Sequence, residues 1–159
     1  HGIALMSYRE GYGFETKIKS DIAPINGLME KALSIGGIVS AKDPTRGGLA
    51  NTVNDFSEKS KVGIIIEEDL LPIPNGVRSA CDMLGIDPLE IGNEGKVVLG
   101  IIKEKADEVF NIIKKHPLGK NAVIIGEATN KLKGVVLQTT VGRKRNLHKP
   151  IGDPVPRIC

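Results

Sequence analysis

Short apolar runs rich in β-branched residues alternate, along this chain of 159 residues, with longer segments whose apolar residues recur every three or four positions. The runs predict strands at about residues 3–7, 38–39, 62–66, 97–102, 122–126 and 135–140, and the run 62–66 is typical of a strand covered on both faces. The periodic segments predict four helices. The first starts after the capping residues Ser20 and Asp21 and ends at Gly36, and the others cover about 49–59, 75–84 and 105–115. Strands that alternate with helices and end in a strand pair predict an α/β domain.

Composition limits the class of protein. With 40% hydrophobic and 26% charged residues the chain fits one compact domain, and no apolar run approaches the roughly 20 residues that span a bilayer. The start of the chain lacks the pattern of a signal peptide, so we expect a cytoplasmic protein without a membrane partner. A net charge of only +3 and 3% aromatic residues argue against nucleic-acid binding. Two cysteines and three histidines without ligand spacing predict neither a metal site nor a disulfide.

The last ten residues differ in composition from the rest. Three prolines in 150–159 favour extended chain, which predicts a domain over 1–149 and a tail that reaches on the order of 30 Å. Cys159 ends this tail, and the preceding prolines argue against its packing in a helix or strand. Because an exposed thiol is chemically hazardous, we interpret Cys159 as a working thiol; the alternative is an accidental terminal cysteine.

A loop that carries phosphate-binding residue types lies between a predicted strand and a predicted helix. It contains Asp43, Thr45, Arg46, Gly47 and Gly48. Glycines before a helix let backbone N–H groups and a guanidinium approach a phosphate closely. The alternative is that Asp43 and Thr45 only cap the helix and that Arg46 is solvated.

A second polar loop carries Asn93, Glu94 and Lys96. An amide, a carboxylate and an ammonium converge in such a turn, and Glu94 could act as a general base if it is partly buried. The alternative is an ordinary solvated loop. Cys81 shares a helical face with Val77 and Leu84, so we expect it in the core.

Three segments together identify a family. They are DPTRGGLA at 43–50, GIDPL at 85–89 followed by NEGK at 93–96, and PRIC at 156–159, and they resemble the HypE family of hydrogenase maturation proteins. The DPTRGG motif is shared with the ATP-dependent superfamily of aminoimidazole ribonucleotide synthetase, and the cysteine tail separates HypE from the other members. The resemblance covers essentially the whole chain and implies the superfamily's C-terminal domain, a mixed sheet layered with helices. The first residues, HGIAL, start inside an apolar run without Met, which indicates a piece of a longer protein.

The resemblance implies a carbamoyl dehydratase. In HypE-like proteins the terminal cysteine, here Cys159, receives a carbamoyl group from HypF, and ATP drives dehydration to a thiocyanate. The cyano group then passes to iron on the HypC–HypD complex. In this reaction Glu94 would be the base, and Asn93 and Lys96 would orient the carboxamide.

The resemblance also implies ATP and Mg²⁺ as cofactors. Arg46 with the backbone of Gly47 and Gly48 would stabilise phosphate charge, and Asp43 would assist a Mg²⁺-linked network. Most Mg-ATP ligands and the contacts of a homodimer are expected on an N-terminal domain that this chain lacks, so we expect the chain alone to be inactive.

Two other functions fit the sequence. In the first, the chain is a partner-docking module that uses the basic cluster 143–145 and the tail, with no covalent chemistry at Cys159. In the second, it belongs to a different ATP-dependent synthetase or kinase of the superfamily, which would leave the cysteine tail unexplained.

Overall fold

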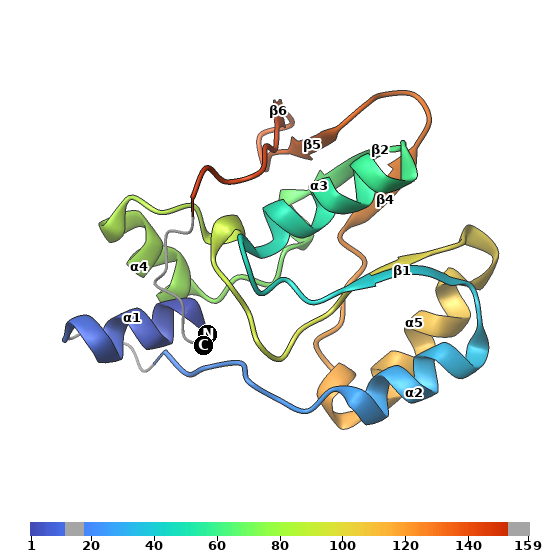
Figure 1. Cartoon of the computed structure of the whole chain (residues 1–159), viewed down its shortest axis with the longest axis horizontal. Coiled ribbons are helices and arrows are strands. Elements are labelled where there is room, and N and C mark those ends of the chain that lie inside the picture. Colours follow the sequence, from blue (N-terminus) through green and yellow to red (C-terminus); the bar gives the residue numbers. More distant parts are fainter. Residues whose placement is uncertain (12–17, 153–159) are drawn as a thin grey trace.

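The computed structural model describes residues 1–11 and 18–152, so Cys159 and most of the predicted tail lie outside the described residues. Within these residues the chain forms five α-helices and six strands (Figure 1). In chain order they are α1 (Gly2–Glu10), α2 (Asn26–Ile35), β1 (Ile38–Lys42), α3 (Gly48–Ser60), β2 (Gly63–Glu67), α4 (Asn75–Leu84), β3 (Val98–Ile101), α5 (Ala106–Lys115), β4 (Gly126–Thr129), β5 (Val135–Gln138) and β6 (Lys144–Asn146). The predicted α/β class is confirmed. No helix of this part is long and apolar enough to cross a membrane.

The main sheet is mixed and is packed against α3. Its strand order is β4-β2-β5-β6, with β2 parallel to β5 and the other two pairs antiparallel. Ala50 and Val53 of α3 pack on Ile64, Ile66 and their neighbours in the largest core cluster. Burial of this apolar surface is the main stabilising contribution to the domain.

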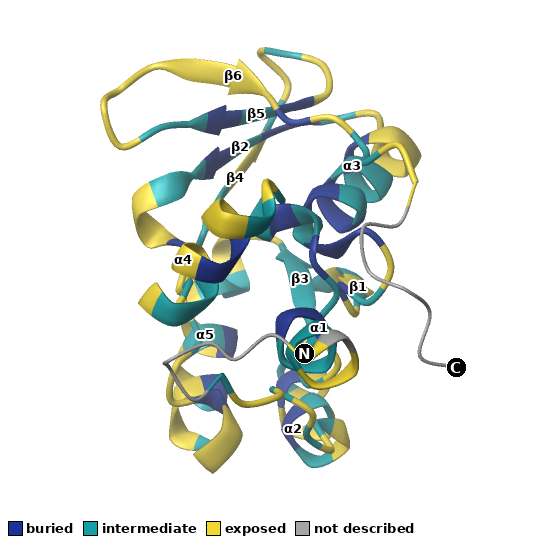
Figure 2. Ribbon diagram, turned by 90° about the vertical axis from the view of Figure 1, so that its left-hand side faces the viewer, coloured by how far each residue is buried: buried dark blue, intermediate teal, exposed yellow. Residues whose placement is uncertain are grey.

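The remaining helices pack in two groups. Strands β1 and β3 form an antiparallel pair, and α2 and α5 pack together against it through Leu28, Ala32, Val109 and Ile113 (Figure 1). Helices α1 and α4 form a separate cluster with the loop that precedes β3 (Figure 2). The polar loops that join these groups carry the predicted site.

The predicted strand at residues 3–7 is wrong, because this segment is the helix α1. A run of four apolar residues does not distinguish a buried strand from a buried helix. Ile3 is 1% exposed and packs with Ala80, Cys81 and Ile91, and the amide of Gly2 donates to the carbonyl of Gly92 at 3.1 Å. Contact with α4 and the loop at Gly92 therefore decides the helical state.

The predicted caps of α2 are also wrong. The helix begins at Asn26 with Ile25 as its N-cap, and no side chain caps it. Ser20 instead accepts a hydrogen bond from the amide of Ile22 at 3.2 Å. Asp21 is used in ion pairs, described below.

The end of the chain differs from prediction in three ways. Strand β4 begins at Gly126, later than the predicted run 122–126, and Val123 and Ile124 are exposed. The last predicted strands do not pair with each other, because β2 lies between them. The charged edge strand β6 has no apolar alternation that predicts it.

In β2, Ile64 and Ile66 are buried while Ile65 on the opposite face is only half-buried, so the strand is not fully covered on both faces.

Candidate functional site

The loop 43–48 joins β1 to α3. Gly47 is the N-cap of α3 with φ 65°, and no side chain caps the helix. The interpretation that Asp43 and Thr45 merely cap this helix is therefore wrong. Asp43 and Arg46 are exposed, and the carbonyl of Arg46 accepts a hydrogen bond from Asn51 Nδ2 at 3.0 Å.

Two glycines let this loop pack against the loop at 89–93. A Cβ on Gly48 would lie 2.5 Å from the carbonyl oxygen of Leu89, and Gly48 has φ +59°. A Cβ on Gly92 would lie 2.3 Å from the carbonyl oxygen of Thr45. The amide of Asn93 donates to the carbonyl of Pro44 at 3.0 Å. The two polar loops predicted from the sequence are thus in direct contact.

Asn93 and Lys96 converge as predicted. Lys96 Nζ donates to Asn93 Oδ1 at 2.6 Å and forms an ion pair with Asp21 Oδ2 at 2.8 Å. Asn93 Nδ2 donates to the carbonyl of Ile91 at 3.0 Å. This ordered network argues against a simple solvated loop at these two residues.

Asp21 belongs to the site, and sequence reasoning missed this role. Burial raises the pKa of Asp21, but the hydrogen bond and positive charge of Lys96 lower it, and the pKa lies below its usual value. The backbone of Asp21 packs directly against Gly95. A Cβ on Gly95 would overlap the carbonyl oxygen of Asp21, so only glycine fits there. Asp21 and Lys96 lie on segments far apart in sequence, so no local pattern signals this pair.

Glu94 does not join the network. Its side chain is exposed and has no hydrogen-bond or ion-pair partner among the described residues. The condition of partial burial under which we expected a general base is not met within this chain.

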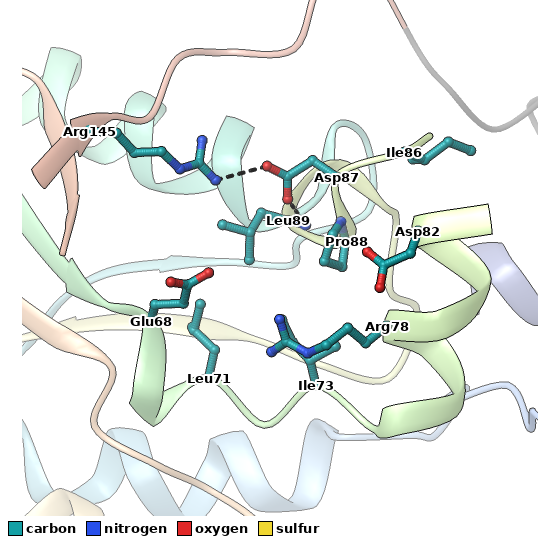
Figure 3. Close-up of a pocket in the computed structure, with 10 residues that line it drawn as sticks. All are labelled: Glu68, Leu71, Ile73, Arg78, Asp82, Ile86, Asp87, Pro88, Leu89 and Arg145. Carbon is teal, nitrogen blue, oxygen red and sulfur yellow. Dashed lines mark hydrogen bonds and ion pairs between the residues drawn. The ribbon is translucent and has the colours of Figure 1, made fainter. Parts of the chain in front are cut away.

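A cavity of about 260 Å³ lies outside the predicted site (Figure 3). Arg78 and Glu68 extend toward it, and Arg145 Nη2 forms an ion pair with Asp87 Oδ2 at 2.9 Å. None of the described residues predicted to act in catalysis or phosphate binding lines this cavity. Its wall includes Leu89, whose carbonyl faces Gly48.

Cys81 is a core residue, as predicted. It is 0% exposed and packs with Ile3, Ala80 and Ile91. Burial raises the pKa of its thiol, with smaller contributions from nearby Asp82 and Asp87. A thiol of this kind is a poor nucleophile.

Asp55, on α3, bridges two lysines from different parts of the chain. Its carboxylate contacts Lys42 Nζ at 2.5 Å and Lys149 Nζ at 2.9 Å, and Lys149 also contacts Glu58 at 2.7 Å. Hydrogen bonds from Lys149 and Lys42 lower the pKa of Asp55 to about 2, although burial opposes them.

These ion pairs predict a loss of stability in acid. Because the folded-state pKa of Asp55 is depressed, its stabilising contribution is present above about pH 4 and is lost as the pH falls toward 2. We expect Asp55→Asn to lower the free energy of unfolding by about 1–2 kcal/mol at pH 6. Urea unfolding of both proteins from pH 6 to pH 2 measures the difference, which should shrink toward zero in acid. A difference that stays constant with pH contradicts this assignment.

Comparison with protein families places the fold. Residues 1–138 match the family described as AIR synthase related protein, C-terminal domain. The chain is 56% identical over 160 residues to a putative hydrogenase expression/formation protein of Methanocaldococcus jannaschii, and 41% identical over 162 residues to the carbamoyl dehydratase HypE of Bradyrhizobium diazoefficiens. The alignments include 100% of this chain but 48% and 47% of those relatives. The chain thus spans about half the length of the curated relatives it matches.

Solved structures agree with this result. A structure of a HypE–HypF complex matches 94% of this chain and 49% of its own, with 45% identity and a TM-score of 0.90. A structure of HypE in complex with ATP matches 97% of this chain and 48% of its own, with 33% identity and a TM-score of 0.90. The HypE resemblance inferred from the sequence motifs is confirmed.

Proposed function

Because this chain belongs to the AIR synthase related family, through that family's C-terminal domain, we propose that it is the C-terminal part of a HypE-type carbamoyl dehydratase. One observation carries the proposal: the whole chain aligns, at 41% identity, with a relative that bears this name. The tail sequence PRIC at 156–159 supports it, because a dehydratase of this kind needs a thiol to carry its substrate.

The proposed reaction converts an S-carboxamide on Cys159 into a thiocyanate. The carbon–oxygen bond of the amide breaks, the nitrogen loses two protons, and a carbon–nitrogen triple bond forms, so that the cysteine loses one water overall. ATP supplies the phosphoryl group that turns the amide oxygen into a leaving group. A base near the nitrogen must accept its protons.

Glu94 is our candidate for this base. Its carboxylate is not committed to another described residue, and the burial that a general base requires would come from the N-terminal domain of the full-length protein. Asn93 and Lys96 lie beside it in a fixed arrangement, held by Asp21. A positioned amide and ammonium orient the carboxamide and stabilise charge that develops on its oxygen.

The loop 43–48 is our candidate contact for ATP. Arg46 presents its guanidinium to solvent at the uncapped start of α3, with Thr45 beside it. Gly47 and Gly48 allow the tight turn that positions these groups.

Mg²⁺ is typically held by one or two carboxylates together with substrate phosphates. Within residues 1–11 and 18–152 no three His, Cys, Asp or Glu side chains gather as a metal site. Asp43, exposed beside Arg46, fits the role of a single carboxylate ligand next to bound phosphates. Mg²⁺ would there neutralise phosphate charge.

The proposed partners follow from the same assignment. HypF would supply the carbamoyl group, in line with the HypE–HypF complex among the similar structures. The HypC–HypD complex would accept the cyano group, and the full-length protein would be a cytoplasmic homodimer. We expect the chain alone to lack activity.

Intact-mass spectrometry of the full-length protein tests the proposal. After incubation with HypF, carbamoyl phosphate and ATP, we expect the protein to gain one carbamoyl group and then to lose one water. Omission of ATP from a purified carbamoylated sample should stop the second step only. In Cys159→Ala neither change should occur. An adduct that persists in this variant, or no adduct in the parent protein, would overturn the proposal and favour a docking module.

A further inference from the structure

Hydrogen bonds and ion pairs hold the segment that precedes the predicted tail against α3. Leu147 is 3% exposed, its amide donates to the carbonyl of Val135 at 2.9 Å, and its carbonyl accepts a hydrogen bond from Asn54 Nδ2 at 2.9 Å. Two residues later, Lys149 Nζ reaches Asp55 and Glu58 of the same helix. Figure 2 shows the segment after β6 passing beside α3. We call residues 147–150 the tail root.

The tail root ends at the start of α3. Pro150 is half-buried, and its Cγ lies 2.8 Å from the position that a Cβ on Gly47 would occupy. Asn51 lies at the same distance from that position, so Gly47 is enclosed between the helix and the tail root. The chain therefore leaves the domain in contact with the loop 43–48, the proposed contact for ATP.

The contacts form a network around Asp55 and are not a set of isolated ion pairs. Asp55 receives two lysines at once, and its side chain is 19% exposed, so the charges are partly shielded from water. The same contacts that lower the pKa of Asp55 raise that of Lys149, through the hydrogen bonds that the Lys149 ammonium donates to Asp55 and Glu58. A network that shares one acceptor loses less side-chain entropy per contact than an isolated pair.

We propose that Asp55 and Glu58 are positioning residues which, through Lys149, fix the tail root beside Gly47 and so direct the carrier thiol toward the ATP-contact loop. This inference rests on the proposed function. Cys159 lies nine residues after Pro150, and an extended chain of that length spans at most about 32 Å. A fixed root at the loop therefore limits the distance between the thiol and the site to that length.

Reversal of one charge tests the anchor. In the full-length protein, Lys149→Glu places a third carboxylate beside Asp55 and Glu58 and repels the tail root from α3, whereas Lys42 still neutralises Asp55. Freeing three more residues lowers the effective concentration of the thiol at the site by about 1.5-fold through tether length alone. Repulsion adds to this loss, so we expect the single-turnover rate of ATP-dependent dehydration to fall about threefold or more.

The rate of carbamoylation by HypF separates positioning from general damage. This step does not require the loop 43–48, so it should remain unchanged in Lys149→Glu, whereas a structural defect would slow both steps. Lys149→Glu combined with Glu58→Lys restores an opposite-charge pair and should recover most of the dehydration rate. Lys59→Glu makes the same charge change at an exposed residue of α3 with no ion-pair partner among the described residues, and it should leave both rates unchanged.

The outcomes distinguish the two proposals. A dehydration rate in Lys149→Glu equal to that of the parent, or no recovery in the combined variant, overturns the positioning role and leaves the proposed function intact. A parent protein that accepts a carbamoyl group but never loses water with ATP removes the proposed function, and the positioning role with it. Slowed dehydration with normal carbamoylation and recovery by the combined variant supports both.

Discussion

Replacing Glu94 with glutamine is expected to slow ATP-dependent dehydration in the full-length protein by about 100-fold or more, while carbamoylation of Cys159 continues at the parent rate. A general base contributes about 10²–10⁴-fold to such a step, and an amide cannot accept the proton. The change keeps the shape of an exposed side chain, so the fold should be unaffected. Quenched-flow intact-mass spectrometry follows both adducts, and the variant should accumulate the carbamoylated form.

Glu90→Gln is the matched control for this prediction. It makes the same chemical change four residues earlier, in the short 3-10 helix Pro88–Glu90 that leads into the same loop. We expect normal dehydration in this variant. Normal dehydration in Glu94→Gln as well would remove Glu94 from the mechanism, and Asp43 would then be the next carboxylate to test.

Replacing Gly48 with alanine is expected to lower the free energy of unfolding by about 3 kcal/mol or more. The new Cβ would lie 2.5 Å from the carbonyl oxygen of Leu89 and 2.7 Å from that of Ile91, and both neighbours are backbone atoms that cannot rotate away. Overpacking of this kind costs about 1–3 kcal/mol, and the left-handed φ of +59° adds about 1–2 kcal/mol. Denaturant unfolding of the parent and the variant measures the sum.

Gly85→Ala isolates the contribution of the contact. Gly85 ends α4 with φ +66°, nearly the same as Gly48, but a Cβ there would meet nothing within 4 Å. The free energy of unfolding of this variant should fall only by the cost of the left-handed backbone, about 1–2 kcal/mol. Equal losses in the two variants would show that the contact between the loops at 43–48 and 89–93 contributes little.

The sequence predicted the helices α3, α4 and α5 well, because each has a long amphipathic repeat and a clear end. It failed at α1, where a short apolar run is ambiguous and contact with Cys81 and Ile91 decides the conformation. It also misplaced the start of α2, because Ser20 and Asp21 have the residue types of a helix cap but are used in other contacts. Residue type alone does not reveal which partner a carboxylate meets.

In the candidate site, too, local patterns predicted some features and missed the contacts between distant segments. Motifs identified both polar loops, and local spacing was enough to bring Asn93 and Lys96 together. Contacts between distant segments were not predictable from any local pattern, and these include Asp21 with Lys96 and Asp55 with Lys149. Such pairs depend on how the segment 18–25 meets the loop before β3, and on how the tail root meets α3, in the folded chain. The part of the site that the motifs missed is therefore the part that holds the predicted residues in place.

The close backbone contacts at Gly48, Gly92 and Gly95 have a consequence for insertions. Surface loops ordinarily accept extra residues with little cost. Here the segment 18–25 lies against Gly95 through the backbone of Asp21 and Ala23, and residues 89–92 lie against Thr45 and Gly48 in the same way. An added residue in either segment would displace Lys96 or Arg46 from its neighbours, although neither segment contains a reacting group. Length, more than composition, should therefore be the property of these loops that varies least among working versions of this protein.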